Sequence, residues 1–195
     1  MKFTYNEKKD LFWAGLMLSL AFAILLSGGL RIFNSGFFII FIIAFFTAGI
    51  GFLLHELMHK YVATRYNLKT EFRAHYGMLW LAIVLSFFGF IIAAPGAVYI
   101  SGRINKEKNG KISLAGPLTN FVLAVIFLSL ILILNPFGIL LALFGFGLTI
   151  NSLLAAFNMI PTMPFDGAKI IQWNKPVYYT TAIASVALFI LSFFV

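Results

Sequence analysis

The sequence predicts an all-α polytopic membrane protein with five or six transmembrane helices. Hydrophobic residues fill 62% of the 195 positions and charged residues only 10%, which is more apolar surface than a water-soluble domain of this length can bury. The apolar residues also gather in blocks of about 20, the length that crosses a bilayer as a helix. Because the connections between these blocks are short, we expect residues 1–195 to form a single membrane domain.

The first apolar block is Leu11–Leu30, which follows three lysines. A cleaved secretory signal has similar flanking charges, but its apolar part is usually only about 7 to 15 residues long. This block is long enough to span a bilayer, so we expect a retained helix. We interpret Glu7 and Asp10, which precede it, as ordinary polar flanking residues.

Four further blocks have the length and composition of spanning helices. Pro136 and Pro176 mark breaks between the later ones, because proline interrupts helix hydrogen bonding. The four blocks are Phe37–Tyr61, Ala115–Leu134, Gly138–Ile160 and Val177–Val195.

The stretch Met78–Ala94 is harder to assign, because it is at the short edge for a span and contains Gly89 near its middle. A re-entrant segment enters and leaves the membrane on the same side, and its backbone must then pack against helices or pair with strands. Thr70–Tyr76 and Ala97–Ser101 mix polar and apolar residues and are short enough to be such strands. We therefore expect a re-entrant or β-hairpin element here.

The basic residues support this choice and set the orientation. With a cytoplasmic amino terminus and a re-entrant Met78–Ala94, the ten Lys and Arg residues between positions 60 and 175 face the cytoplasm, and only Arg31 lies outside. A crossing segment would move Arg103–Lys111 outside. We expect a multi-pass protein of the plasma membrane. The net charge of +8 is spread over the ends of the apolar blocks, so it favours lipid head groups and not nucleic acid.

A metal-binding pattern, His55-Glu56-Leu57-Met58-His59, lies near the end of the second block. On a helix the two histidines are about 6 Å apart along the axis and roughly 40° apart around it, so both imidazoles face one side and can hold one ion. Glu56 then lies beside that ion. The structural alternative is a pairing of Glu56 with Lys60 four residues later, which leaves the histidines unexplained.

A catalytic zinc usually has three protein ligands, and the chain has no cysteine. Asp166 is the best candidate for the third ligand, because the expected topology places it on the same side as the histidines. Pro161 and Pro164 break the helix before it, and Gly167 permits an unusual backbone angle, so the carboxylate can turn back toward the bundle. An exposed Asp-Gly turn is the alternative. Glu71 and His75 adjoin a possible strand and are the other candidates, whereas we interpret Glu107 as part of a solvated loop.

Together these patterns resemble the site-2 protease family of intramembrane zinc metalloproteases. That family has a membrane HExxH and a distant NxxPxxPxDG, and both are intact here, as His55–His59 and Asn158–Gly167. Gly116–Asn120 is similar to the family's GPxxN element. The resemblance covers about residues 37–169 and implies a minimal form without PDZ or CBS domains.

The resemblance also implies roles for individual residues. One Zn²⁺ per chain would be held by the two histidines and Asp166, and Glu56 would be the general base that accepts a proton from the attacking water. Asn158 would point at the substrate carbonyl or the oxyanion formed from it, with a helix-packing amide as the alternative. We expect Asn120 to tie helices together.

The expected substrate is a membrane-anchored protein with a single transmembrane helix. Its peptide bonds must be unwound before cleavage, and pairing with one of the two strands would achieve this. A membrane metal-ion transporter that uses the His/Asp cluster as a transit site is the main alternative, although transport pathways usually have ligands at several depths. A scaffold with a structural zinc is a further alternative, but such zinc sites normally have four protein ligands.

Overall fold

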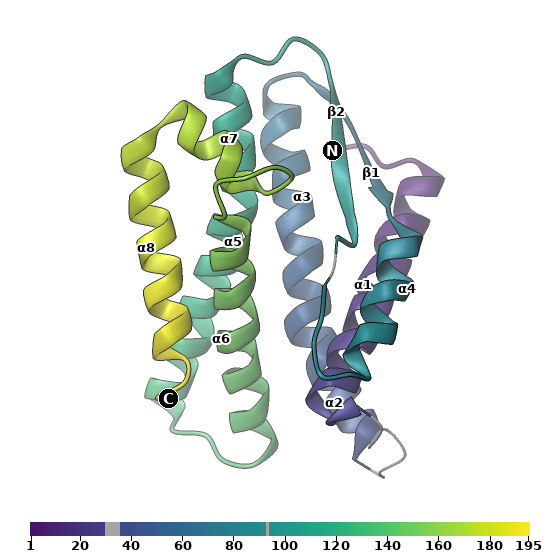
Figure 1. Cartoon of the computed structure of the whole chain (residues 1–195), viewed down its shortest axis with the longest axis vertical. Coiled ribbons are helices and arrows are strands. Elements are labelled where there is room, and N and C mark those ends of the chain that lie inside the picture. The colour runs from purple at the N-terminus through teal and green to yellow at the C-terminus, as the bar shows by residue number, and fades with distance from the viewer. Residues whose placement is uncertain (30–35, 93) are drawn as a thin grey trace.

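A computed structural model describes residues 1–29, 36–92 and 94–195 of the chain. It is a bundle of long helices with a small two-stranded antiparallel sheet toward one end, and the two termini lie toward opposite ends of the bundle (Figure 1). This architecture confirms the predicted class of polytopic helical membrane protein. In chain order the elements are α1 (Tyr5–Leu26), α2 (Phe37–Ala44), the π-helical segment η2 (Phe45–Gly49), α3 (Ile50–Arg65), β1 (Lys69–Ala74), α4 (Tyr76–Ser86), β2 (Gly96–Ser101), α5 (Lys106–Leu134), α6 (Ile139–Asn158), α7 (Asp166–Trp173) and α8 (Lys175–Leu191).

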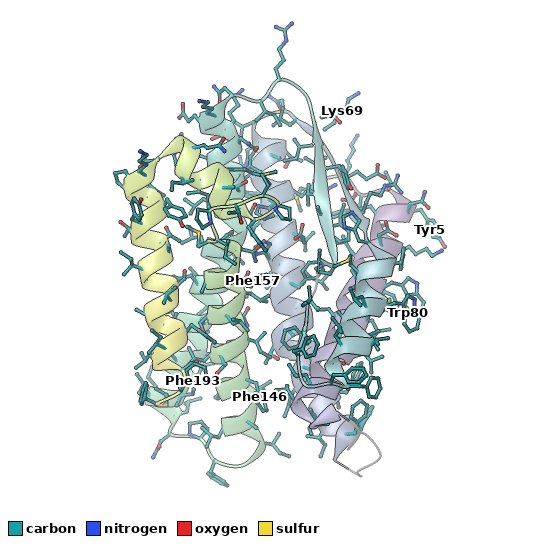
Figure 2. All side chains as sticks on the ribbon, in the orientation of Figure 1. Tyr5, Lys69, Trp80, Phe146, Phe157 and Phe193 are labelled. Atoms are coloured by element: carbon teal, nitrogen blue, oxygen red, sulfur yellow. The ribbon has the colours of Figure 1, made fainter. Side chains whose placement is uncertain are left out.

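Four helical segments of the described chain are long and apolar enough to cross a membrane. They are α1, the continuous run from α2 through η2 to α3, α5 and α6. With 17 residues, α8 is at the lower limit for a span. Large apolar side chains such as Trp80 and Phe193 are exposed at the periphery of the bundle, as expected for contact with lipid (Figure 2).

Two helices, α1 and α5, start earlier than the apolar blocks suggested, because polar residues cap them. The Thr4 side chain accepts a hydrogen bond from the Glu7 amide at the start of α1, and Asn105 does the same for Lys108 at the start of α5. Such caps satisfy amide groups that have no partner within the helix. Leu30, the predicted end of the first block, and Arg31, the predicted outer basic residue, lie outside the described residues.

The segment after β1 does not cross the bundle. α4 has only 11 residues, about 16 Å of helix against a hydrocarbon core of about 30 Å. β1 and β2 flank this segment and pair with each other, from Lys69 opposite Ser101 to Ala74 opposite Gly96. The chain therefore leaves and returns on the same side, which confirms the re-entrant prediction. The predicted first strand was too long at its end, because Tyr76 already begins α4.

Two carboxylates of α1 hold the outer edge of β1. The Glu7 carboxylate is 1% exposed, pairs with Lys60 Nζ at 2.6 Å and accepts a hydrogen bond from the Phe72 amide at 3.1 Å. Asp10 accepts one from the Ala74 amide at 3.2 Å. The interpretation of Glu7 and Asp10 as ordinary flanking residues was therefore wrong, because both join α1 to the sheet.

Small residues allow the helices around the site to approach closely. A Cβ on Gly49 would collide with the Ser19 hydroxyl of α1, and one on Gly147 would lie 2.6 Å from the Phe127 ring of α5. Small residues at helix contacts are typical of membrane bundles. α5 packs directly against α3, α6 and α7, the helices that carry the candidate site residues.

Candidate metal centre

The two histidines of the HExxH pattern lie on one face of α3, as predicted. Both are buried, with 5% exposure for His55 and 8% for His59. Their Nε2 atoms are 3.0 Å apart and the ring planes are nearly perpendicular. The spacing of four residues thus brings the two ring nitrogens to one point, where they face α5.

Asp166 reaches the same point from the first residue of α7. Its Oδ2 lies 3.4 Å from His55 Nε2 and 3.1 Å from His59 Nε2. Burial opposes ionisation of this side chain, but the histidines more than offset that effect and hold the pKa of the carboxyl below its ordinary value. An anionic carboxylate is the form that binds a metal.

Gly167 is required for a different reason than the sequence suggested. It is not among the glycines with positive φ, so the expectation of an unusual backbone angle was wrong. A Cβ at Gly167 would instead collide with the main chain of Met159 and Ile160. The close approach of α7 to the end of α6 brings Asp166 back to the bundle.

These three residues fit a zinc ion. Their ligand atoms all lie within 4.8 Å of one another, and ligands at about 2.0–2.2 Å from a tetrahedral zinc are separated by roughly 3.3 Å. His59 Nδ1 lies 2.8 Å from the Ile112 carbonyl, which can only accept, so this nitrogen carries a hydrogen, and in the neutral ring Nε2 then carries the lone pair. Two facing nitrogens and a carboxylate bring electron pairs to one point, and a cation bound there would stabilise this arrangement.

Gly116 of α5 leaves the room that such an ion needs. A Cβ at this position would collide with the Nε2 atoms of both His55 and His59. Any other residue at position 116 would therefore push against the metal-binding atoms. Sequence reasoning placed Gly116 in the GPxxN element but did not give it this role.

Each histidine also forms a hydrogen bond through Nδ1, on the side of the ring away from the cluster. His55 Nδ1 lies 2.6 Å from Asn120 Oδ1, and His59 Nδ1 bonds to Ile112, as described above. Such outer partners fix the orientation of a metal-binding imidazole. Asn120 does tie helices together, as expected, since it also donates to the Gly51 carbonyl on α3 at 3.2 Å. Its contact with His55 was not anticipated, because nothing in the local pattern indicates it.

Glu56 lies beside the cluster. It is 8% exposed and close enough to His55, His59 and Asp166 for electrostatic interaction. Lys60, the alternative partner, pairs with Glu7, and no Lys or Arg ion pair of Glu56 is found in the described part of the chain. The structural explanation for Glu56 is thereby removed.

Asn158 is the last residue of α6, and no hydrogen bond joins it to the cluster within the described ranges. Its Nδ2 donates to the Leu154 carbonyl at 2.9 Å, one turn earlier in the same helix. The predicted role of Asn158 toward a substrate carbonyl stays a prediction. The candidate ligand His75 lies instead 3.2 Å from the Tyr99 hydroxyl, Glu71 pairs with Arg73 and Glu107 pairs with Lys111.

Comparison with known proteins gives several similar sequences. The chain is 48% identical over 142 residues to "Putative zinc metalloprotease MJ0611" of Methanocaldococcus jannaschii, which covers 72% of this chain and 74% of that protein. It is 34% identical over 150 residues to "Zinc metalloprotease MJ0392" of the same organism, covering 74% of this chain and 37% of the relative. It is 30% identical over 145 residues to "Putative zinc metalloprotease YwhC" of Bacillus subtilis, covering 63% and 64%.

No family model matches the chain, and no solved structure matches it. The matched region of the second relative is only 37% of that protein's length. The first relative is matched over nearly three quarters of its length, and the buried cluster of His55, His59 and Asp166 fits the metal that its name contains. The chain belongs to the zinc metalloprotease family that these relatives represent.

Proposed function

We propose that the chain is an intramembrane metalloprotease of the site-2 type, which hydrolyses peptide bonds in or near the transmembrane segments of single-span membrane proteins. The observation that carries this proposal is the buried cluster of His55, His59 and Asp166, which is built by membrane-length helices and their connections. Ionisable groups inside a membrane are costly and usually functional. Metal ligands on membrane-length helices therefore favour a protease that acts in the membrane over a water-soluble one.

The residues divide the chemistry between them. His55, His59 and Asp166 would hold one zinc per chain, and zinc bound there would polarise the scissile carbonyl and lower the pKa of water toward about 7. Glu56 accepts the proton of the attacking water and passes it to the departing amine. Asn158 donates a hydrogen bond to the carbonyl oxygen of the substrate, after its side chain leaves the Leu154 carbonyl.

The substrate must be extended to react, and the sheet offers one edge for this. In an antiparallel pair, residues alternate between those that bond to the partner strand and those whose N–H and C=O point outward. On β1 the Phe72 amide points outward to Glu7 and the Ala74 amide points outward to Asp10. That edge is therefore already occupied by α1.

The register identifies the open edge. Phe72 is opposite Val98 and Ala74 is opposite Gly96, so the outward groups of β2 belong to Gly96, Val98 and Ile100. No hydrogen bond from another element reaches the main chain of these three residues in the described part of the protein. β2 lies on the side of the sheet away from α1 (Figure 1). A substrate strand would add here.

The experiment that tests the proposed function compares the wild-type chain with Glu56→Gln. The purified proteins are assayed for bound zinc and for cleavage of a panel of single-span membrane proteins in lipid vesicles. We expect both proteins to bind one zinc, and the variant to lose cleavage by about 100-fold or more, because a positioned general base contributes roughly 10²–10⁴-fold.

Glu71→Gln is the matched control, because it removes a partly exposed carboxylate that pairs with Arg73 outside the cluster. It should cleave like the wild type. Equal cleavage by Glu56→Gln would contradict the assignment of the base. Zinc flux across the vesicles without cleavage by any of the proteins would favour the transporter instead.

A further inference from the structure

Two asparagines buried at the centre of the bundle form a chain of hydrogen bonds that ends at a zinc ligand. Asn120 of α5 and Asn151 of α6 are both fully buried, and Asn120 Nδ2 donates to Asn151 Oδ1 at 3.0 Å. Asn151 belongs to none of the sequence patterns above. A buried amide pair is expensive unless every polar atom has a partner.

The orientation of the Asn151 amide is fixed by carbonyl groups. Its Nδ2 lies 2.9 Å from the Gly147 carbonyl and 3.4 Å from the Thr47 carbonyl of η2. Exchange of its nitrogen and oxygen would place an oxygen against two acceptors, so the oxygen of Asn151 must face Asn120. Gly51 makes room for it, because a Cβ there would collide with Asn151 Oδ1.

The same reasoning fixes the next amide. Asn120 faces two acceptors, Asn151 Oδ1 and the Gly51 carbonyl, and therefore turns its nitrogen toward both. Its oxygen is left to face His55 Nδ1 at 2.6 Å. An amide oxygen only accepts, so the hydrogen of the neutral His55 ring must be on Nδ1 and the lone pair on Nε2.

We infer that Asn151 is a positioning residue for the metal centre, which acts through Asn120 to hold His55 in the tautomer that presents Nε2 to zinc. This inference rests on the proposed function for its purpose, although the hydrogen bonds themselves do not depend on it. Two backbone carbonyls, from α6 and from the π-helical segment η2, thus determine which nitrogen of a histidine on α3 is free. π-Helical turns inside α-helices often occur at functional sites.

The test is a double-mutant cycle on zinc affinity, measured by competition with a chelator in detergent. Asn120→Leu should weaken zinc binding by roughly 10- to 100-fold, as is usual for loss of an outer partner of a ligand. Asn151→Leu should weaken it by about tenfold. If Asn151 acts through Asn120, the double variant binds zinc no more weakly than Asn120→Leu alone.

Ser152→Ala is the matched control. Ser152 is equally buried on α6 and bonds only to carbonyls of its own helix, so its loss should leave zinc affinity unchanged. Losses that simply add in the double variant would overturn the inference, because independent packing defects add.

A second measurement needs neither zinc nor activity. Nitrogen-15 NMR of the metal-free protein distinguishes a His55 ring protonated at Nδ1 from one protonated at Nε2. We expect Nδ1–H in the wild type and in Ser152→Ala, and a mixture of tautomers in Asn151→Leu and in the smaller Asn151→Ala, because both variants remove the oxygen that accepts from Asn120. An unchanged tautomer in both Asn151 variants would overturn the inference. Absence of zinc binding by the wild type would instead contradict the proposed function, and the NMR result would still stand.

Discussion

Gly116 leaves open the space next to two of the candidate metal ligands. It lies on α5 directly opposite the ring nitrogens of His55 and His59, and a Cβ at this position would collide with both of them. The histidines provide the donors, but the neighbouring helix must leave a gap for the ion. A metal ion at this site would need both the donor atoms of the candidate ligands and the absence of a side chain at position 116.

We predict that Gly116→Ala lowers zinc affinity by about tenfold or more. Overpacking of a filled site costs about 1–3 kcal/mol, and each 1.4 kcal/mol is a tenfold change in affinity. The metal-free protein should also lose stability, by up to about 2 kcal/mol, because the Cβ meets the histidine rings themselves and the helix preference for alanine, about 1 kcal/mol, offsets only part of the overpacking cost. Zinc competition and thermal unfolding of the metal-free protein measure the two effects.

Gly145→Ala is the control for this prediction. Gly145 is also inside a long helix, α6, but a Cβ there would have nothing within 4 Å. The control should therefore gain helix stability and keep its zinc affinity. Similar zinc affinities for Gly116→Ala and the wild type would show that the gap is not needed.

The sequence contained enough information for the three candidate ligands but not for what supports them. His55 and His59 were predicted from their spacing, which on a helix fixes their common face. Asp166 was predicted from prolines and from the side on which basic residues fall. Asn120 and Gly116 act across a helix contact, and a single sequence does not specify which residues of two helices meet.

At the scale of elements, the sheet and α1 form one unit that the sequence did not indicate. Carboxylates just before an apolar block usually face water, so Glu7 and Asp10 were interpreted in that way. Their partners Phe72 and Ala74 are more than 60 residues away in the chain. The strands themselves were predicted nearly correctly, since their composition is a local property.

The open edge of β2 leads to a prediction. Val98→Pro removes an outward N–H and leaves the bonds between β1 and β2 intact, because Val98 belongs to a pair that does not bond across the sheet. We expect cleavage of single-span substrates to fall by about tenfold or more, with zinc content unchanged. Cleavage in vesicles and metal analysis of the same preparation measure both.

Val98→Ala separates the backbone from the side chain. Alanine keeps the N–H and removes most of the apolar side chain, which packs partly against the core. If substrate pairs with this edge, Val98→Ala cleaves nearly as well as the wild type. A similar loss in both variants would point to packing of Val98 and would contradict strand addition.

For the whole molecule, the direction of the helices fixes where the metal centre lies. α5 runs the length of the bundle between Lys106 and Leu134 and is long and apolar enough to cross a membrane, so we expect its two ends on opposite sides. The candidate ligands lie toward the end that includes Lys106, where His59 bonds to Ile112. The rule that basic residues prefer the cytoplasm led us to expect this end inside the cell.

Labelling of single introduced cysteines tests the orientation. The sequence has no cysteine of its own, so each variant carries one reactive thiol. Lys106→Cys marks the end near the metal centre, and Phe137→Cys marks the opposite connection, where the side chain is 88% exposed. A thiol reagent that does not cross membranes should label only Phe137→Cys in intact cells. Labelling of only Lys106→Cys would place the metal centre outside.

The carboxylates of α1 have a mechanical consequence. Because Glu7 and Asp10 accept hydrogen bonds from consecutive outward amides of β1, the start of α1 is joined to the sheet at two points. A thicker or thinner bilayer can change the tilt of a spanning helix, and we expect such a change in α1 to displace β1 and the strand β2 that pairs with it. We therefore expect cleavage of the proposed substrates to depend on bilayer thickness, which assays in vesicles of short-chain and long-chain lipids would measure.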